Sequence, residues 1–387
     1  MECQRCGNKD PTYFYLGSKG YYCRKCIRFS RILIEEELEP LNYEVDDKAN
    51  DYSFKYTLTN KQIEAASKCA NYLNEDCDVL LNCVCGAGKT EIVVKSISEY
   101  LAKGLKVAYA IARKEVVIEL AKRFQRIFPN ARVTSVYGGH HSCLTGDLIV
   151  CTDHQLYRYY KTFDLLILDE VDAFPLKGNE TLMNIALNSA KGRIIFSTAT
   201  VDQMLMNILS KRKYSEVNLY VRPSNSPLCV PRILFLSSML LVIYLTILMH
   251  QITNQCIIFV SSKKQCVSLY KLFSHLYPCI YVYADLKERN DFIRDFKDKK
   301  YQFIFATSVL ERGITISGID VIIIDNKNVF DEANIIQMLG RVGRDINNTN
   351  GKGYLLVDYP NKKLRNILNY LKKANDYLWN VYFVMNI

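Results

Sequence analysis

Residues 82–90 read NCVCGAGKT, a glycine-rich turn that ends in Lys-Thr. The apolar run DVLLN (78–82) precedes this turn, and a run with helical character (91–103) follows it. A strand, a glycine turn and a helix in this order are typical of a phosphate-binding loop, because backbone N–H groups and the helix N-terminus surround phosphate oxygens. Lys89 would place its ammonium group on the β and γ phosphates, and Thr90 would offer its hydroxyl to Mg²⁺. The predicted ATP-binding loop consists of Cys85, Gly86, Ala87, Gly88, Lys89 and Thr90.

The cysteines of this stretch allow a second interpretation. Cys83 stands where the usual GxxxxGK[ST] pattern has its first glycine, and Cys85 follows two positions later. One intervening residue is a poor spacing for a metal chelate compared with two. We therefore interpret both cysteines as small apolar packing residues rather than as a metal or redox site.

A carboxylate pair follows another apolar run, DLLILDEVDAFP (164–175). At the tip of a strand, Asp169 would hold Mg²⁺ and Glu170 would polarise the attacking water. Acid pairs at strand ends are also common in solvated loops without a catalytic role. The catalytic interpretation of Asp169 and Glu170 therefore depends on the phosphate loop that precedes them in the sequence.

The alternation of apolar and helical runs sets the fold class. Short β-branched or leucine-rich runs alternate with helical stretches from residue 78 to 198 and again from 256 to 359. This rhythm predicts an α/β protein with two tandem parallel sheets. The proline- and serine-rich stretch 222–232 (RPSNSPLCVPR) marks the hinge. The predicted domains are 52–224 and 225–387.

Composition limits the remaining classes of protein. The chain has 387 residues, 49% of them hydrophobic, which is enough for two packed domains. Its net charge of +10 favours an anionic partner such as nucleic acid or a membrane surface. Fourteen cysteines without a secretory leader indicate reducing cytosol.

One uncharged run, 233–249, could contradict the assignment to the cytosol, because it could cross a membrane. Its 17 residues lie at the lower limit of a membrane span. We expect instead a buried strand followed by a core helix of the second domain, because serines and a threonine interrupt the run and no paired basic residues flank it.

The N-terminal 34 residues contain two C-x₂-C pairs, CQRC and CRKC, which predict a zinc-binding module. The predicted ligands are Cys3, Cys6, Cys23 and Cys26. Basic residues and aromatics surround the cysteines; they suit contacts to single-stranded nucleic acid, or else form the small core of the module. Residues 35–51 carry eight carboxylates and one lysine, and we interpret them as an acidic linker.

Further motifs give a family resemblance. DEVD (169–172), STAT (197–200), TSVLERGITISGID (307–320) and QMLGRVGR (337–344) resemble, in this order, motifs II, III, V and VI of superfamily 2 helicases. The resemblance implies tandem RecA-like domains, with ATP in the cleft between them and DNA lying across both. Arg341 and Arg344 lie three positions apart, on one face of an expected helix, and would reach the γ-phosphate when the cleft closes.

The same resemblance assigns further roles. Gln62 would read adenine, and Glu311, Gly313 and Gln337 would be polar or backbone neighbours of the nucleotide. The implied DNA contacts are Arg113, Thr152, His154 and Thr307. The residues implied to couple hydrolysis to movement are Ser197, Thr198 and Thr200.

With its N-terminal cysteines, the chain resembles the ComFA family of late competence proteins. That resemblance implies an ATP-, Mg²⁺- and Zn²⁺-dependent motor on single-stranded DNA that drives DNA uptake in natural transformation. It implies a cytoplasmic protein, peripheral at the inner face of the cell membrane, which contacts the DNA-uptake channel, other competence proteins and further copies of itself. The alternatives are a replication-restart helicase of the PriA type and an adaptor for nucleic acid or membrane with a vestigial ATP site.

Overall fold

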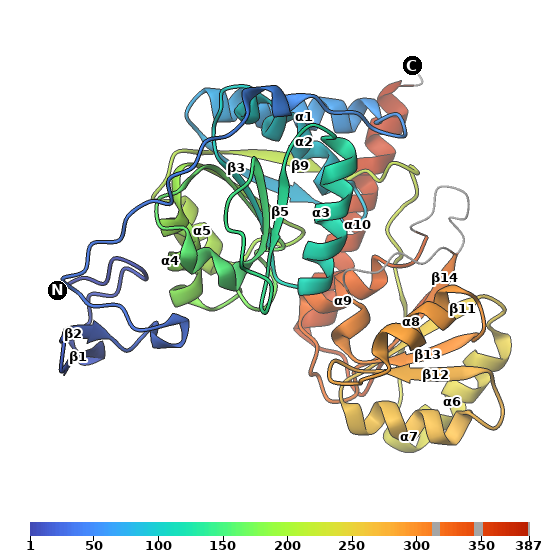
Figure 1. The fold of residues 1–387 in the computed structure, drawn as a ribbon. Coiled ribbons are helices and arrows are strands. Elements are labelled where there is room, and N and C mark those ends of the chain that lie inside the picture. The colour runs from blue at the N-terminus through green and yellow to red at the C-terminus, as the bar shows by residue number, and fades with distance from the viewer. Residues whose placement is uncertain (312–317, 344–350, 386–387) are drawn as a thin grey trace. The chain divides into compact units, whose positions relative to one another are not determined.

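The computed structural model describes residues 1–311, 318–343 and 351–385, with side chains described as far as residue 376. Tertiary contacts divide the chain into two units. Unit 1 comprises 1–83 and 88–219, and unit 2 comprises 84–87 and 220–387. Each unit contains one large parallel sheet (Figure 1), which confirms the predicted α/β class with two tandem parallel sheets.

A small module begins unit 1. Strands β1 (Phe14–Gly17) and β2 (Gly20–Cys23) form an antiparallel hairpin, and the 3-10 turns η1 (Pro11–Tyr13) and η2 (Ile27–Phe29) flank it. All four predicted zinc ligands are buried, and they belong to the same apolar cluster as residues beneath the large sheet of unit 1. The module is therefore packed onto unit 1.

The acidic segment 35–51 lies along unit 1. The Leu41 N–H donates to Thr162 Oγ1 at 3.0 Å, and Lys106 Nζ donates to the Leu41 carbonyl at 2.8 Å. The Lys106 ammonium also lies 4.4 Å from the centre of the Tyr43 ring. The segment ends in the 3-10 turn η3 (Asp47–Asn50).

The sheet of unit 1 has the strand order β5-β6-β4-β7-β8-β3-β9, and all of its pairs are parallel. Central strands such as β4 and β6 are buried along their whole length, as expected for a parallel sheet covered on both faces. The strands are β3 (Asp78–Cys83), β4 (Val107–Ile111), β5 (Val133–Val136), β6 (Leu148–Thr152), β7 (Phe163–Asp169), β8 (Ala190–Thr198) and β9 (Tyr214–Leu219).

The helices of unit 1 begin at clear signals. Thr59 and Gln62 form a capping box on the first helix, and the Asn179 and Asp202 side chains cap two later ones. Between β6 and β7 the chain forms a 3-10 turn rather than an α-helix. These elements are α1 (Asn60–Asn74), α2 (Lys89–Leu101), α3 (Lys114–Ile127), η4 (Asp153–Arg158), α4 (Glu180–Ser189) and α5 (Gln203–Leu209).

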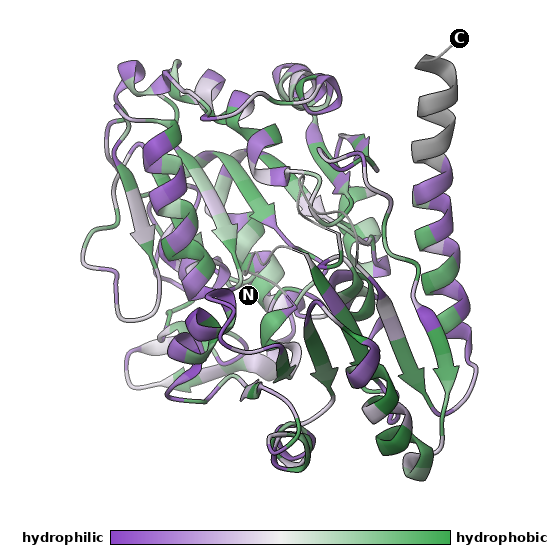
Figure 2. Cartoon of the chain, turned by 90° about the vertical axis from the view of Figure 1, so that its right-hand side faces the viewer, coloured by the Kyte–Doolittle hydropathy of each residue, from purple (hydrophilic) through white to green (hydrophobic). Residues whose placement is uncertain are grey.

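The sheet of unit 2 has the order β10-β15-β14-β11-β13-β12 and is also parallel. Figure 2 shows the strands of both sheets mostly in the green of hydrophobic residues, whereas most helices carry purple as well. The strands are β10 (Arg232–Phe235), β11 (Gln255–Val260), β12 (Cys279–Val282), β13 (Phe303–Ala306), β14 (Ile319–Ile324) and β15 (Gly353–Val357). The turn η5 (Ser308–Leu310) follows β13, and the helices are α6 (Ser238–Gln251), α7 (Lys263–Phe273), α8 (Arg289–Lys297), α9 (Glu332–Leu339) and α10 (Lys362–Met385).

The uncharged run 233–249 forms most of β10 and α6, so the expected strand and helix are present. The expectation that both are buried is wrong, because β10 lies at the edge of the sheet and α6 buries only one face. Met239 is 86% exposed and Ile243 60% exposed on the other face. Within the described part of the chain, no helix has both the length and the hydrophobicity that a membrane crossing requires.

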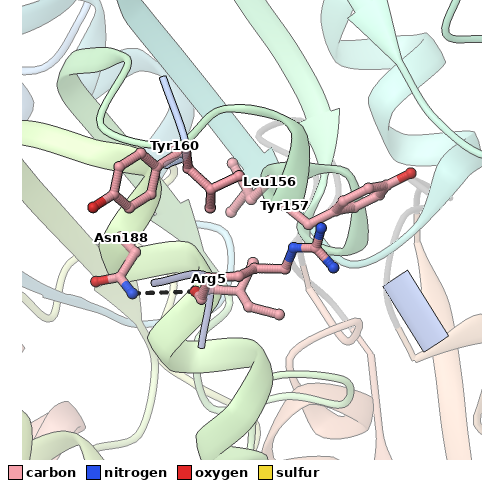
Figure 3. Close-up of a pocket in the computed structure, with 7 residues that line it drawn as sticks. Arg5, Leu156, Tyr157, Tyr160 and Asn188 are labelled. Carbon is pink, nitrogen blue, oxygen red and sulfur yellow. Dashed lines mark hydrogen bonds between the residues drawn. The ribbon is translucent and has the colours of Figure 1, made fainter. Parts of the chain in front are cut away.

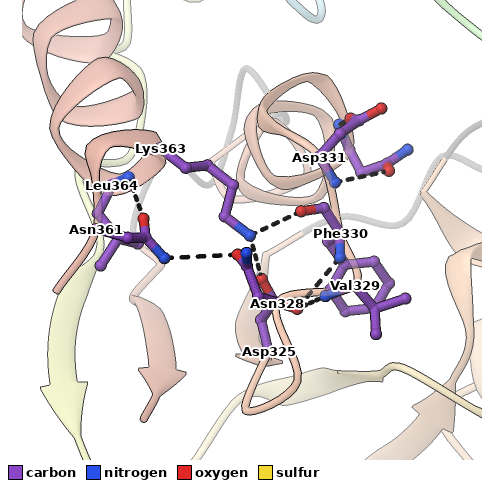
Figure 4. Close-up of polar contacts among 9 residues, drawn as sticks. Asp325, Asn328, Val329, Phe330, Asp331, Asn361, Lys363 and Leu364 are labelled. Atoms are coloured by element: carbon purple, nitrogen blue, oxygen red, sulfur yellow. Dashed lines mark hydrogen bonds and ion pairs between the residues drawn. The ribbon is translucent and has the colours of Figure 1, made fainter. Parts of the chain in front are cut away.

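A buried ion pair fixes the start of α10 (Figure 4). Lys363 Nζ lies 2.5 Å from Asp325 Oδ2 and donates to the Phe330 carbonyl at 2.7 Å. Asp325 Oδ1 also accepts from the N–H groups of Val329 and Phe330, at 2.7 and 3.2 Å. The carboxylate therefore links the loop after β14 to α10.

Candidate active site

The phosphate loop begins at the carboxyl end of β3, and α2 begins at Lys89. Gly86 and Gly88 both have positive φ, 84° and 88°, a backbone conformation that glycine adopts without strain. A Cβ added to Gly88 would also come within 2.3 Å of Gln62 Nε2. Position 88 therefore requires glycine for two reasons: its positive φ, and the short distance to the Gln62 side chain.

Gln62 lies beside this loop, on the first turn of α1. Its Oε1 accepts from the Thr59 N–H at 3.0 Å, and the residue is only 4% exposed. The capping box thus fixes the amide plane, with Nε2 toward Gly88. Reading of adenine by Gln62 remains a prediction, although its position beside the loop suits it.

Asp169 is the centre of a buried polar cluster at the end of β7. Its Oδ2 accepts from the Tyr109 hydroxyl at 2.6 Å, and its Oδ1 accepts from Ser197 Oγ at 2.8 Å. Lys89 Nζ lies 4.0 Å from Oδ1. Burial raises the pKa of the Asp169 carboxyl, and Lys89 and the two hydroxyl donors oppose that rise. The donors therefore favour the ionised form that a magnesium ligand must have.

Tyr109 contacts the candidate site, and the sequence did not reveal this. It lies on β4, is 1% exposed and also hydrogen-bonds to the Thr90 side chain. Its hydroxyl thus joins both predicted magnesium ligands. A tyrosine hydroxyl in a buried strand generally has a hydrogen-bond partner. The presence of a tyrosine within an apolar run was the only sign of this contact that the sequence offered.

Glu170 adopts a left-handed backbone conformation, with φ of 60°. Its N–H donates to Asp169 Oδ1 at 3.0 Å. A non-glycine residue at this angle costs about 1–3 kcal/mol and is found where the surroundings enforce it, often at functional sites.

The predicted coupling residues form a second cluster. Thr200 Oγ1 donates to Asp172 Oδ2 at 2.7 Å, and the Thr200 N–H donates to Thr198 Oγ1 at 3.1 Å. Ser197 contacts Asp169, as described above. The DEVD and STAT stretches are therefore joined by hydrogen bonds at two points, so a displacement of one would move the other.

The donor set fits ATP and Mg²⁺. The Lys89 side chain is only 14% exposed and lies in front of a carboxylate, and hard oxygen donors from Thr90 and Asp169 lie close together. Cys83 is fully buried, which raises the pKa of its thiol to about 12. A neutral, buried thiol agrees with the interpretation of Cys83 as a packing residue.

The predicted DNA contacts in unit 1 differ in exposure. Arg113 immediately precedes α3 and His154 lies on η4, and both are partly exposed. Thr152 is only 7% exposed, at the end of β6. Burial lowers the pKa of His154, and Arg28 of the N-terminal module lowers it further. These DNA contacts remain predictions.

In unit 2, Asn334 Nδ2 donates to both carboxylate oxygens of Glu311, at 3.2 and 3.1 Å. Arg341 Nε donates to the Glu311 carbonyl at 3.1 Å. The predicted helical position of Arg341 is wrong, because α9 ends at Leu339 and Gly340 begins a turn. Gln337 is 5% exposed on α9, and Thr307 is partly exposed after β13. Gly313 and Arg344 lie outside the described residues.

Arg222 is a second residue that the sequence did not reveal. It is 2% exposed, and its two Nη atoms donate to the carbonyls of Val342, Gly343 and Gly340, at 2.9, 3.3 and 3.1 Å. These carbonyls form the turn that carries Arg341. A guanidinium group thus holds the end of α9 and the turn after it. Its place in a proline- and serine-rich stretch gave no sign of burial.

The four N-terminal cysteines form a cluster that could hold a metal ion. Their Sγ atoms all lie within 4.8 Å of one another, with Cys3 and Cys26 at 3.7 Å and Cys6 and Cys23 at 3.8 Å. Tetrahedral zinc with Zn–S bonds of about 2.3 Å requires sulfur atoms about 3.8 Å apart. Hydrogen bonding with Cys26 lowers the pKa of Cys3, whereas interactions within the same cluster raise the pKa values of Cys6 and Cys26. The spacing of the sulfur atoms fits Zn²⁺.

Comparisons with known proteins agree with these sites. A family model described as "Type III restriction enzyme, res subunit" matches residues 55–203, and "Helicase conserved C-terminal domain" matches residues 238–345. Competence protein ComFA of Streptococcus pneumoniae is 28% identical to this chain, over 96% of this chain and 90% of that protein. Competence protein ComFA of Bacillus subtilis is also 28% identical, over 97% of this chain and 85% of that protein.

A solved structure of S. cerevisiae Dbp5, bound to RNA and ADP BeF3, is 18% identical with a TM-score of 0.59. The alignment covers 82% of this chain and 91% of that one, and it confirms the tandem RecA-like fold. The predicted resemblance to superfamily 2 helicases and to the ComFA family is also confirmed. The chain therefore contains helicase-type domains that support a superfamily 2 ATPase, and these domains imply ATP and Mg²⁺.

Proposed function

We propose that this ATPase moves along single-stranded DNA and drives DNA uptake in natural transformation. The proposal rests mainly on the buried Asp169 carboxylate, which accepts a hydrogen bond from Tyr109 and lies 4.0 Å from the Lys89 ammonium. The chain that carries this site is similar to two ComFA proteins along almost its whole length. An adaptor with a vestigial ATP site would not need to keep this carboxylate buried and held by two hydroxyl donors.

Each residue of the site has a defined task in hydrolysis. Lys89 would bind the β and γ phosphates, and Thr90 and Asp169 would hold Mg²⁺. The ion neutralises charge that develops on the phosphates. Glu170 would orient the attacking water, and the hydrogen bonds from Thr200 and Ser197 would pass the change in phosphate state to the STAT stretch.

The four N-terminal cysteines would hold one Zn²⁺, as the distances between their sulfur atoms favour. In the cell, the protein would act at the inner face of the membrane, beside the DNA-uptake channel and other competence proteins. Further copies of the chain could join it there.

The fold favours movement along a single strand over separation of duplexes. Between β13 and α9, the described residues form only η5 and β14, with no hairpin that could act as a wedge. A strand that enters already single would need no wedge.

The test is ATP hydrolysis with single-stranded DNA and with blunt duplex, alongside displacement of a labelled strand from a tailed duplex. We expect strong stimulation by the single strand, little stimulation by the duplex, and weaker stimulation at high salt because phosphate contacts dominate binding. Efficient unwinding of a long duplex would favour the replication-restart helicase. Hydrolysis that is absent with and without DNA would favour the adaptor.

A further inference from the structure

The outer face of the N-terminal hairpin combines aromatic rings with guanidinium groups. Tyr15 and Tyr22 are paired across the two strands, and their rings meet edge to face with centroids 5.7 Å apart. The Arg24 guanidinium lies 5.7 Å from the centre of the Tyr15 ring, and that of Arg31 lies 4.6 Å from the centre of the Tyr22 ring. We call these four residues the hairpin face.

The tyrosines of this face are not the core of the module. Side chains alternate along a strand, so Tyr15 points away from Phe14, which packs against the cluster around the cysteines. Tyr15 is 53% exposed, and neither it nor Tyr22 belongs to that cluster. Core packing therefore explains Phe14, whereas Tyr15 contacts Tyr22 and Arg24 and leaves much of its surface exposed.

The charge around the hairpin face is positive. From residue 10 to 31 the chain carries Lys19, Arg24, Lys25, Arg28 and Arg31 against one carboxylate, Asp10. Asp10 accepts hydrogen bonds from the Thr12 N–H and hydroxyl, at 3.0 and 2.8 Å, and so caps η1. Glu36, in the acidic segment that follows, accepts from the Leu33 N–H at 3.4 Å. Asp10 and Glu36 thus each accept a hydrogen bond from a neighbouring residue, while Arg24 and Arg31 are exposed.

The module is fixed next to η4, where the sequence predicts a DNA contact. The Phe29 ring is buried between those of His154 and Tyr157, with centroids 6.0 and 5.6 Å away. Figure 3 shows Asn188 beneath Tyr160, with its amide directed at the Arg5 carbonyl, while the Arg5 guanidinium lies near Tyr157. The module is therefore attached to unit 1 through Arg5 and Phe29, with Phe29 against η4.

We propose that the hairpin face is a second binding surface for single-stranded DNA. Bases stack on Tyr15 and Tyr22, and phosphates contact Arg24 and Arg31, which is the combination that binds single strands with little sequence preference. The surface extends the strand's contact beyond η4. This inference rests on the proposed function, because it takes single-stranded DNA as the substrate.

The test uses the full-length, zinc-loaded protein and a fluorescently labelled oligo(dT). Tyr15→Ala should weaken binding about 5- to 150-fold, the range for loss of one stacked base. It should raise the DNA concentration for half-maximal ATPase stimulation and leave the maximal rate unchanged. The control is Tyr359→Ala, which removes a tyrosine of unit 2 that is 55% exposed and should change neither quantity.

The arginines are tested through salt. The double variant Arg24→Ala, Arg31→Ala should reduce the slope of log affinity against log salt by about 1.4, at about 0.7 per phosphate contact on a single strand. Photo-crosslinking of a bromouracil-containing strand should label the hairpin in the wild type. Zinc content equal to wild type shows that each variant keeps its module folded.

Equal DNA affinity for Tyr15→Ala and Tyr359→Ala would overturn the inference. So would loss of binding to anionic lipid vesicles with DNA binding retained, because the face would then serve the membrane surface. Failure of wild-type protein to respond to single-stranded DNA at all would instead overturn the proposed function, so the two failures can be told apart.

Discussion

Tyr109→Phe is the sharpest test of the buried cluster around Asp169. The change removes one oxygen atom and keeps the ring, which packs with its centroid 5.3 Å from that of Phe124. Asp169 keeps the Ser197 donor at 2.8 Å and Lys89 at 4.0 Å, and loses only the 2.6 Å hydrogen bond from Tyr109. The variant therefore removes one donor from the carboxylate, together with the contact between the Tyr109 hydroxyl and the Thr90 side chain.

The size of the effect follows from the kind of bond that is lost. A hydrogen bond to a charged group contributes about 1.5–3 kcal/mol, and about 1.36 kcal/mol corresponds to a factor of ten. We therefore expect the Mg²⁺ concentration for half-maximal hydrolysis to rise about 10- to 150-fold. Burial already raises the pKa of Asp169, and loss of a donor to its charged form raises it further. Since Mg²⁺ binding requires the carboxylate, activity falls as the pH drops through this pKa, and the variant should lose activity at higher pH than wild type.

The measurement is DNA-stimulated ATP hydrolysis across Mg²⁺ concentration and pH, with Mn²⁺ binding by electron paramagnetic resonance as a reading that does not depend on turnover. Tyr159→Phe is the matched control. Tyr159 is fully buried, and its hydroxyl has no hydrogen-bond partner among the residues that the structure describes. If Tyr109→Phe and Tyr159→Phe show the same Mg²⁺ dependence, the Tyr109 hydroxyl does not support the metal site and the reasoning is refuted.

Three further changes probe other parts of the chain. Lys89→Ala should reduce ATP hydrolysis about 10²- to 10³-fold and leave DNA affinity nearly intact, because the ammonium acts on the phosphate charge of the nucleotide. Turnover equal to wild type in a steady-state assay would contradict the assignment of residues 85–90 as the phosphate-binding loop. Purified protein should contain about one zinc per chain by metal analysis, and Cys23→Ser should lose it, while replacement of the exposed Cys143 should not. Lys363→Met should lower the free energy of unfolding by about 3–5 kcal/mol in urea titration, because it leaves the buried Asp325 carboxylate without its cation. Replacement of the exposed neighbour Lys362 should change it by less than about 0.5 kcal/mol.

Apart from the edge strand β10, the predicted strands were those inside the two sheets. Runs such as 107–111 and 320–324 are apolar throughout because parallel strands are covered by helices on both faces. The strands that the sequence did not reveal are β5, β9 and β12, and all three lie at sheet edges. An edge strand faces solvent on one side and carries polar residues, as YSEVNL in β9 does, so it lacks the continuous apolar pattern.

The candidate site was predictable where chemistry requires particular residues at fixed spacing. The glycines, Lys89 and Asp169 are of this kind, since phosphate and magnesium allow few substitutes at the end of a strand. Tyr109 and Arg222 were not predictable, because their roles depend on neighbours 60 and 118 or more positions away in sequence. A tyrosine in an apolar run suggests packing, and an arginine among prolines and serines suggests an exposed hinge. The helical position predicted for Arg341 is wrong because α9 ends at Leu339, two residues before it, with Gly340 as the C-cap.

The N-terminal module shows how zinc and packing depend on each other. A segment of about 34 residues cannot bury enough apolar surface to fold by itself, so the four cysteines must supply part of its stability through the metal. The rest comes from unit 1, where Phe29 is buried against η4, a contribution of about 1.5–3 kcal/mol for a phenylalanine side chain. The Asn188 amide also donates to the carbonyls of Gln4 and Arg5, both at 3.1 Å. Because these contacts come from the same turns that carry the cysteines, loss of the metal would release Phe29 from η4, and the hairpin face would lose its fixed position beside the predicted DNA contact.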